Sequence, residues 1–396
     1  MTPLFLTATA LVTALGRGLP ATLEALRAER SALTPCDFDD VRVGGHIGRV
    51  AGLEAAPLPP GLAGYDCRNN RLAHLALRGD GFAAGVADAI ARYGAGRIAV
   101  VLGTSTSGIL SAENAYRARD PDTGLLPAWF SYNDSYDLFS LPRFVAACLG
   151  VEGPMMTVST ACASSAQACL DGAQLIEAGV VDAAIVGGTD SLCRLTLNGF
   201  NALELVSPER CRPFDVSRTG ISIGEAAGFA LLERAQHGPA DLALLGVGAS
   251  SDGYHMSSPQ PDGIGAAQAM RAALHSAGLE PDDIDHVNLH GTGTRANDLM
   301  EGIAMRGLFG GTMACASTKG WTGHCMGSSG IVEALISGLC IAGDLLPGCL
   351  GLGTPDPAIP ITPTRRNTQA PVARVMSNSF GFGGVNVSLV LGRAPT

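Results

Sequence analysis

The chain has 396 residues, of which 46% are hydrophobic and 16% are charged, and its formal net charge is −10. This composition excludes a disordered chain, which would lack the apolar surface needed to offset the entropy of ordering. The acidic balance argues against general nucleic-acid binding, which relies on a basic surface. A prior of roughly 150 residues per domain suggests about two to three structural units.

The first apolar segment covers residues 3–16 (PLFLTATALVTALG) and is too short to span a bilayer. It lacks the basic leader and the cleavage site of a secretory signal, so we expect a first strand and turn in a cytoplasmic protein with no membrane segment. The 11 cysteines are scattered and form no C-x-x-C pair, which argues against a zinc ribbon and a thioredoxin-type pair. Most of them should be small, inert, buried side chains.

Apolar strands then alternate with alanine-rich helices, which is the pattern of an α/β protein. The expected strands are residues 97–102, 155–158, 183–186, 229–232, 287–289 and 387–391, and the expected helices are residues 81–93, 164–178, 266–277 and 328–339. Two similar units, each with a Ser-Thr pair after a strand and a helix downstream, suggest a duplicated fold with halves at residues 1–240 and 241–396.

The first segment that could carry chemistry is V-S-T-A-C-A-S-S-A, residues 158–166. A strand ends there, the chain turns sharply, and a helix begins at Cys162. Backbone N–H groups and the helix dipole favour negative charge at such a position. We therefore expect a lowered thiol pKa and a nucleophilic cysteine. An inert buried cysteine is the alternative.

The second segment is H-V-N-L-H-G-T-G-T, residues 286–294. His290 ends an apolar strand and precedes a glycine/threonine loop, which could offer hydroxyls and amides to a polar ligand. The absence of H-E-x-x-H argues against zinc, and no other ligand cluster has the spacing of a metal site. A structural histidine at the end of a strand is the alternative.

The third segment is S-T-K-G-W-T-G-H, residues 317–324. Lys319 stands in a small, apolar setting where burial without a partner would be costly. Asp298 and Glu301 lie at i, i+3 spacing, so a helix would present both on one side, and either could pair with Lys319. An ordinary structural ion pair is the alternative.

The last segment is S-N-S-F-G-F-G-G-V-N, residues 377–386, between two expected strands. It lacks the G-x-G-x-x-G spacing of a dinucleotide site, and the chain contains no Walker pattern. A glycine turn can bring a backbone N–H close to a reacting oxygen, which a side chain would obstruct. A tight turn between core strands is the alternative.

Taken together, T-A-C-A-S-S-A, H-G-T-G-T, S-T-K-x-x-T-G-H and N-S-F-G-F-G-G resemble the elongating β-ketoacyl-acyl-carrier-protein synthases, which are related to thiolases. The match is ordered and spans nearly the whole chain. It implies a duplicated thiolase-like fold with five αβαβα layers. It also implies an acyltransferase that condenses an acyl group with malonyl-acyl carrier protein in fatty-acid or polyketide synthesis. Residues 198–203 look closer to aryl-polyene ketosynthases than to housekeeping enzymes.

The resemblance also implies roles for the catalytic residues. Cys162 would carry the acyl group as a thioester. His290 and His324 would hydrogen-bond the thioester carbonyl of the malonyl extender and stabilise the enolate formed on decarboxylation. Lys319 would support the histidine pair, with Glu301 as its partner.

Further positions follow from the same resemblance. Thr292 and Thr294 would hold the phosphopantetheine arm of the carrier. The backbone N–H groups of Cys162 and Phe382 would form an oxyanion hole, and the Phe382 ring would gate access. We expect Gly108, Ile109 and residues 130–139 to bound the acyl pocket.

The resemblance implies no metal and no cofactor, because the substrates travel on the phosphopantetheine of the acyl carrier protein. We expect the acidic carrier to dock near Arg68 and Arg71, a local basic pair. The partner subunit would be an identical chain or a related one of the chain-length-factor type.

Three alternatives stay open: a non-catalytic chain-length factor, a thiolase-type acyltransferase and a binding-only scaffold. The presence of Cys162, His290 and His324 argues against the first.

Overall fold

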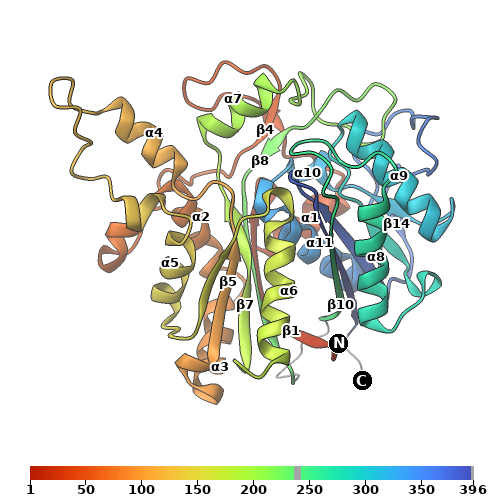
Figure 1. Ribbon diagram of the computed structural model, residues 1–396, viewed down its shortest axis with the longest axis horizontal. Helices are drawn as coiled ribbons and strands as arrows, with labels where there is room; N and C mark the ends of the chain where they lie inside the picture. The colour runs from red at the N-terminus through yellow and green to blue at the C-terminus, as the bar shows by residue number, and fades with distance from the viewer. Residues whose placement is uncertain (236–241, 394–396) are drawn as a thin grey trace.

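The computed structural model describes residues 1–235 and 242–393 (Figure 1). The expected boundary at residue 240 lies outside the described residues. Ten strands form two blocks of five, which meet where β1 (Leu4–Thr13) pairs antiparallel with β10 (Leu242–Ser251). The first block runs in the order β6 (Met155–Val158), β5 (Ile98–Gly103), β7 (Ala183–Asp190), β9 (Ala226–Glu233) and β1. The second runs in the order β12 (Cys315–Ala316), β11 (His286–Asn288), β15 (Arg374–Phe380), β16 (Val385–Arg393) and β10.

The two blocks have the same topology. In each, the first strand in chain order lies at the edge shared with the other block, and the third lies at the opposite edge. The second strand pairs parallel with the third and the fourth, and the fifth pairs antiparallel with the fourth and the first. The chain therefore repeats one fold, as the paired sequence units suggested.

Helices separate and cover the two blocks. The central layer consists of α6 (Ser164–Glu177) and α11 (Ser329–Gly343), which pack against each other and against both blocks. The outer face of the first block is covered by α2 (Arg68–Leu77), α3 (Phe82–Tyr93) and α5 (Ser140–Leu149), and that of the second by α8 (Ile264–Ala277) and α9 (Arg295–Phe309). Figure 1 shows these layers from left to right. The expected five-layered αβαβα architecture is confirmed.

Shorter elements complete the chain. They are α1 (Leu19–Arg27), α4 (Ile109–Arg117), α7 (Arg194–Ala202), α10 (Lys319–Thr322), β2 (Gly16–Arg17), β3 (Thr34–Pro35), β4 (His46–Gly48), β8 (Ile223–Gly224), β13 (Leu345–Leu346) and β14 (Thr368–Gln369). Every strand and helix expected from the sequence is present with boundaries shifted by a few residues. The helices that the sequence pattern missed, such as α2 and α9, carry mixed polar and apolar residues and depend on packing for their stability.

The core strands are buried on both faces. All residues of β5, β7 and β9 are buried, which explains why these strands are continuous apolar runs in the sequence rather than alternating ones. Among the described residues, Met326–Gly343 is long and apolar enough to cross a membrane, but 83% of it is buried inside the protein. This segment is the core helix α11 with the turn that precedes it.

Each half also contributes a sharp turn that leads into its central helix. The turn Ala161–Ala163 precedes α6, and the turn Met326–Ser328 precedes α11. Both turns start on a residue with left-handed backbone geometry that is not glycine: Ala161 has φ 49° and Met326 has φ 51°. Such geometry is costly for an L-residue and is found where a structure holds functional groups in place. The candidate site lies where these two turns meet.

Candidate active site

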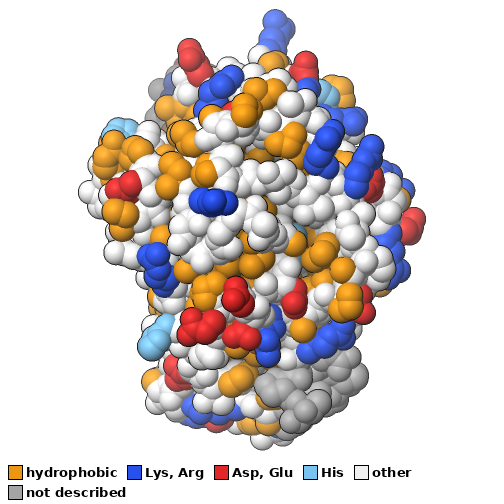
Figure 2. Space-filling view, turned by 90° about the vertical axis from the view of Figure 1, so that its right-hand side faces the viewer, with side chains coloured by type: hydrophobic (Ala, Val, Ile, Leu, Met, Phe, Trp, Pro, Cys, Tyr) orange, Lys and Arg blue, Asp and Glu red, His pale blue; other side chains and the backbone are white. Residues whose placement is uncertain are grey.

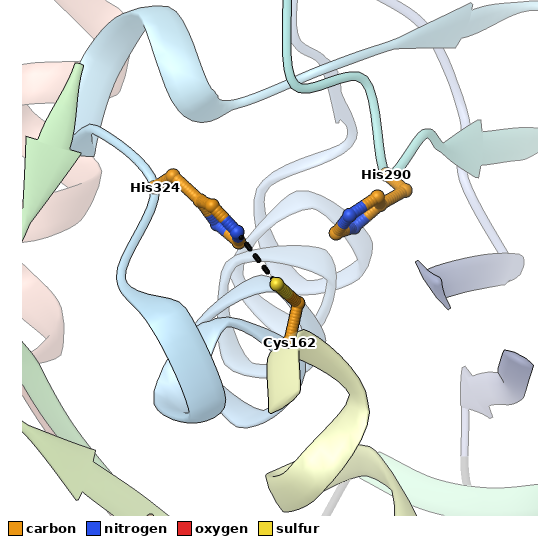
Figure 3. Close-up of side chains that lie close together, drawn as sticks. All are labelled: Cys162, His290 and His324. Atoms are coloured by element: carbon orange, nitrogen blue, oxygen red, sulfur yellow. Dashed lines mark hydrogen bonds between the residues drawn. The ribbon is translucent and has the colours of Figure 1, made fainter. Parts of the chain in front are cut away.

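Cys162 is the second residue of the first turn, directly before α6. Its side chain points toward two imidazole rings from the other half of the chain (Figure 3). Close packing of β5 against α6 fixes its position, because a Cβ on Gly103 would lie 2.4 Å from the Ser165 backbone nitrogen. Only glycine allows that approach. The cysteine is 6% exposed.

His324 faces Cys162 directly. Its Nε2 lies 3.0 Å from the Cys162 Sγ, and its Nδ1 lies 3.0 Å from the Ser329 Oγ. The main chain of His324 is held from both sides: its N–H donates to the Ser222 carbonyl at 2.7 Å, and its carbonyl accepts from the Gly224 N–H at 2.9 Å. The backbone of His324 is therefore fixed in place, and each ring nitrogen has a hydrogen-bond partner.

His290 stands at the end of β11, on the other side of the thiol. Its ring centroid lies 5.5 Å from that of His324, and the two planes cross at 83°. The Lys319 Nζ lies 3.4 Å from His290 Nδ1 and also donates to the His290 carbonyl. Because an ammonium group can only donate, Nδ1 must accept, and the ring proton of His290 resides on Nε2.

The electrostatics of the site are dominated by burial. Burial lowers the pKa of His290 and His324 well below 6.5, and the nearby charge of Lys319 lowers both further. Both rings are therefore neutral near pH 7. Burial raises the pKa of the Cys162 thiol to about 11, although Lys319 and the backbone N–H of Phe382 oppose this rise. The expected lowering of the thiol pKa is thus wrong, because the loss of solvation outweighs the helix N-terminus.

Glu301 does not pair with Lys319. It accepts hydrogen bonds from the backbone N–H of His290 at 2.7 Å and of Gly291 at 2.8 Å, so it holds the His290 loop in place. It is fully buried and does not line the cavity above Cys162, so the expectation of a substrate-binding role is wrong. The ion-pair partner of Lys319 is Glu333 on α11. The sequence motifs do not point to Glu333. The signal that could have found it is a single carboxylate in an otherwise apolar helix, which needs a buried partner.

The Lys319–Glu333 pair is buried on both sides, with side-chain exposures of 0% and 2%. Burial raises the pKa of Glu333 to about 7, and Lys319 opposes that rise. Asp298, the other carboxylate considered for Lys319, accepts from the Phe214 and Gly293 N–H groups and lies 3.3 Å from Arg218. Each buried carboxylate thus has its own partners.

A cavity of about 440 Å³ opens above the three side chains. Thr292 and Thr294 line it, as expected, and their hydroxyl oxygens lie 2.9 Å apart. Phe382 also lines it, with its ring 5.8 Å from that of Phe200. A Cβ on the preceding Gly381 would lie 2.6 Å from the Thr160 carbonyl oxygen, so glycine lets the Phe382 loop approach the Cys162 turn.

Gly108 and Ile109 do not line this cavity. Ile109 begins α4 and faces a separate surface groove, together with Tyr116 and Tyr136. A Cβ on Gly108 would lie 1.5 Å from the Ser135 carbonyl oxygen, so this glycine serves a close backbone approach. Neither residue lines the cavity that contains Cys162, and the expected acyl-pocket role of both stays a prediction.

The buried carboxylate of Asp190 bends the chain between β5 and Gly108. Asp190 accepts four hydrogen bonds on its Oδ1 from the backbone and side chains of residues 104–106. These bonds curl the chain at the end of β5, before it reaches Gly108 and α4. These contacts join residues that are 84 to 86 positions apart, so no local motif predicts them.

Arg68 and Arg71 are not a free basic pair. The side chain of Arg68 is 8% exposed and makes ion pairs with Glu225 at 2.6 Å and Glu54 at 2.7 Å. Arg71 binds both carboxylate oxygens of Asp66, at 2.5 and 2.6 Å. Both arginines are paired within the chain, so they are not the free basic pair from which a carrier-docking site was expected, and docking there stays an untested prediction.

The ligand atoms of Cys162, His290 and His324 all lie within 4.8 Å of one another, and this is a donor set that a soft metal could use. Two of these atoms, the His324 Nε2 and the Cys162 Sγ, contact each other at 3.0 Å. The expectation that the protein works without a metal or cofactor stays a prediction.

Comparisons with known proteins agree with this arrangement. The N-terminal domain model of β-ketoacyl synthases matches residues 71–238, and the C-terminal domain model matches residues 242–352. Nodulation protein E of Rhizobium meliloti (strain 1021) is 34% identical over 332 residues, which cover 80% of this chain and 79% of that protein. The 3-oxoacyl-[acyl-carrier-protein] synthase 2 of the same organism is 39% identical over 261 residues, or 61% of this chain and 62% of that enzyme.

Solved structures of ketosynthases match this chain over nearly its full length. A ketosynthase (ApeO) in complex with its chain length factor (ApeC) from Xenorhabdus doucetiae has a TM-score of 0.89 and 39% identity, covering 99% of this chain and 98% of that one. The ishigamide ketosynthase/chain length factor has a TM-score of 0.88 and 28% identity, covering 100% of both chains. The chain belongs to the β-ketoacyl synthase family and is an acyltransferase of the elongating type, which acts in fatty-acid or polyketide synthesis.

Proposed function

We propose that the protein extends an acyl chain held on Cys162 by decarboxylative condensation with a malonyl group on an acyl carrier protein. One observation carries this proposal: a thiol and two neutral imidazoles converge at the floor of a single cavity. The thiol provides the covalent attachment point, and the imidazoles provide uncharged N–H donors for a developing oxyanion.

In the first half-reaction, the Cys162 sulfur attacks the carbonyl of the incoming acyl thioester. The bond to the pantetheine sulfur breaks, and the proton of the cysteine leaves on the pantetheine thiol, so no net proton is consumed. The backbone N–H groups of Cys162 and Phe382 would bind the oxyanion of the tetrahedral intermediate. The contact of His324 with the Cys162 sulfur stabilises the thiolate as it forms.

In the second half-reaction, the carboxylate of the malonyl group leaves as carbon dioxide and its electron pair forms an enolate. His290 and His324 donate to the enolate oxygen. The enolate carbon then attacks the acyl carbonyl on Cys162, and the released thiolate takes up one proton. Neutral donors suit this step because an imidazolium would protonate the enolate that must attack.

The extender arrives on a carrier. Thr292 and Thr294 line the same cavity as the two histidines, and their hydroxyls can bind the amides of a pantetheine arm there. An acyl carrier protein is therefore the proposed substrate partner, and the reaction needs no cofactor of the enzyme itself. The 11 unpaired cysteines suit a reducing compartment, in keeping with a cytoplasmic enzyme.

We further infer that the chain works with a chain-length-factor subunit, as the ketosynthase of Xenorhabdus doucetiae does. The edge strand β6 leaves one side of the sheet open and carries Met155 and Met156 at 36% and 38% exposure. Leu138, whose carbonyl accepts a hydrogen bond from the Thr157 hydroxyl of that strand, is also exposed. By contrast, charged side chains interrupt the hydrophobic ones on the face of α8 and α9 (Figure 2). An identical second chain is the alternative occupant, and the aryl-polyene subgroup stays a prediction.

The two half-reactions can be tested separately with Cys162→Ala, His290→Ala and His324→Ala. Cys162→Ala should form no acyl adduct by intact-mass spectrometry and should still release carbon dioxide from malonyl carrier. Each histidine variant should acylate and should decarboxylate about 100- to 1,000-fold more slowly, which is the usual loss for one oxyanion donor. An acyl adduct on the Cys162→Ala protein, or a histidine variant that decarboxylates at the parent rate, would refute the proposed roles.

A further inference from the structure

The hydroxyl of Ser329 occupies the side of the His324 ring that faces away from the thiol. Ser329 is the first residue of α11 and is 1% exposed, and its Oγ lies 3.0 Å from His324 Nδ1. Within residues 1–235 and 242–393, no other hydrogen bond reaches that nitrogen. Because His324 is itself only 2% exposed, solvent has little access to replace the contact.

A neutral imidazole has one N–H and one bare nitrogen, so the partner of Nδ1 decides what Nε2 can do. The enolate oxygen of the proposed reaction can only accept a hydrogen bond. His324 can therefore serve that oxygen only if Nε2 carries the proton and Nδ1 accepts from a donor. The Ser329 hydroxyl is placed to be this donor.

We propose that Ser329 is a positioning residue, which donates its hydroxyl proton to His324 Nδ1 and so holds the Nε2–H form of the ring toward Cys162. The inference rests on the proposed function and extends it by one residue. Each catalytic histidine then has its own support, since Lys319 fixes His290 in the same way from an ammonium group.

The difference between the two supports has an electrostatic reason. The charge of Lys319 already lowers the pKa of both imidazoles. A second buried cation would add a desolvation cost and would need a second carboxylate like Glu333. A hydroxyl supplies the hydrogen bond without a charge, so it fixes the ring and leaves the site with one buried ion pair.

The chain offers a matched control next to this residue. Ser328 is also fully buried, but its hydroxyl donates to the Cys325 carbonyl at 2.7 Å and not to a histidine. Ser329→Ala and Ser328→Ala therefore remove the same atom from neighbouring buried positions. Ser329→Thr keeps a hydroxyl at the tested position.

The kinetic test measures carbon dioxide release from malonyl carrier and acylation of Cys162 for each variant. Ser329→Ala should slow decarboxylation roughly 10- to 100-fold, by analogy with the loss of a hydrogen-bond partner that orients a metal-ligating histidine, and should change acylation much less. Ser329→Thr should recover most of the rate, and Ser328→Ala should match the parent. Equal loss in both alanine variants, or a parental rate in Ser329→Ala, overturns the proposal.

A spectroscopic test does not depend on activity. Long-range proton–nitrogen spectra of ¹⁵N-histidine-labelled protein report which ring nitrogen carries the proton, and comparison with His324→Ala assigns the His324 signals. The parent should show a bare Nδ1 and a protonated Nε2, and Ser329→Ala should show a mixture of the two forms. A protonated Nδ1 in the parent overturns the proposal. If the parent fails to condense substrates but shows the expected Nε2–H form, the proposed function fails and the positioning role of Ser329 stands.

Discussion

At the residue scale, the site combines groups that burial drives to their neutral forms with one buried ion pair. The two imidazoles are neutral because burial and Lys319 lower their pKa values. The thiol is neutral for the same reason, since burial raises its pKa to about 11. Lys319 forms a buried ion pair with Glu333. Near pH 7 the site therefore holds two neutral imidazoles and a protonated thiol.

This balance predicts the pH dependence of Cys162 reactivity. Because the pKa of the thiol is about 11, the thiolate fraction, and with it the rate of alkylation by iodoacetamide, should rise roughly tenfold per pH unit from pH 7 to 10. Intact-mass spectrometry with peptide mapping follows Cys162 alone, and Cys162→Ala provides the background from the other cysteines. A rate that levels off below pH 8 would show a thiolate already formed at neutral pH and would contradict this prediction.

At the scale of elements, two strand–turn–helix units position the chemistry. The turn Ala161–Ala163 presents the thiol, and residues 323–325, directly before the second turn, present His324. Each turn depends on close backbone contacts with its neighbours. The central helices α6 and α11 also touch closely, because a Cβ on Gly330 would lie 2.6 Å from the Ala166 nitrogen. Small residues therefore set the distance between the two halves of the site.

Gly103→Ala tests this dependence. The added Cβ would lie 2.4 Å from the backbone nitrogen of Ser165, so α6 must move away from β5 and take Cys162 with it. Overpacking of this kind costs about 1–3 kcal/mol, which chemical denaturation can measure, and the acylation rate of Cys162 should fall with it. Gly96→Ala is the control, since nothing lies within 4 Å of its added Cβ. Parental stability and acylation in Gly103→Ala would show that the contact does not position the thiol.

At the scale of the whole molecule, duplication leaves two halves joined at β1 and β10 and a free edge at β6 and at β12. The β6 edge carries exposed methionines, and an open apolar edge strand normally pairs with another chain or is protected. All three side chains at the floor of the site come from this one chain. The proposed subunit contact is therefore an assembly feature and supplies none of these three groups.

Met156→Asp should weaken that assembly. The variant places a charge on the exposed edge strand, and size-exclusion chromatography with light scattering should show loss of the partner subunit or of a second copy. Ile303→Asp is matched for exposure, at 37% against 38% for Met156, and lies on α9. It should leave the assembly unchanged. An intact complex in Met156→Asp with unchanged circular dichroism would remove β6 from the interface.

The sequence by itself determined the layered α/β fold, because strands buried on both faces must be continuous apolar runs. It also determined which residue types carry the chemistry, since each lies in a local motif that ends a strand or starts a helix, as Cys162 and His290 do. Only the tertiary structure decided how buried groups are paired and solvated. Glu333 rather than Glu301 meets Lys319, and Arg68 is neutralised by Glu225, which is 157 positions away. The local motif mispredicts the thiol pKa for the same reason: a helix end is a local feature, whereas desolvation depends on everything packed around the sulfur.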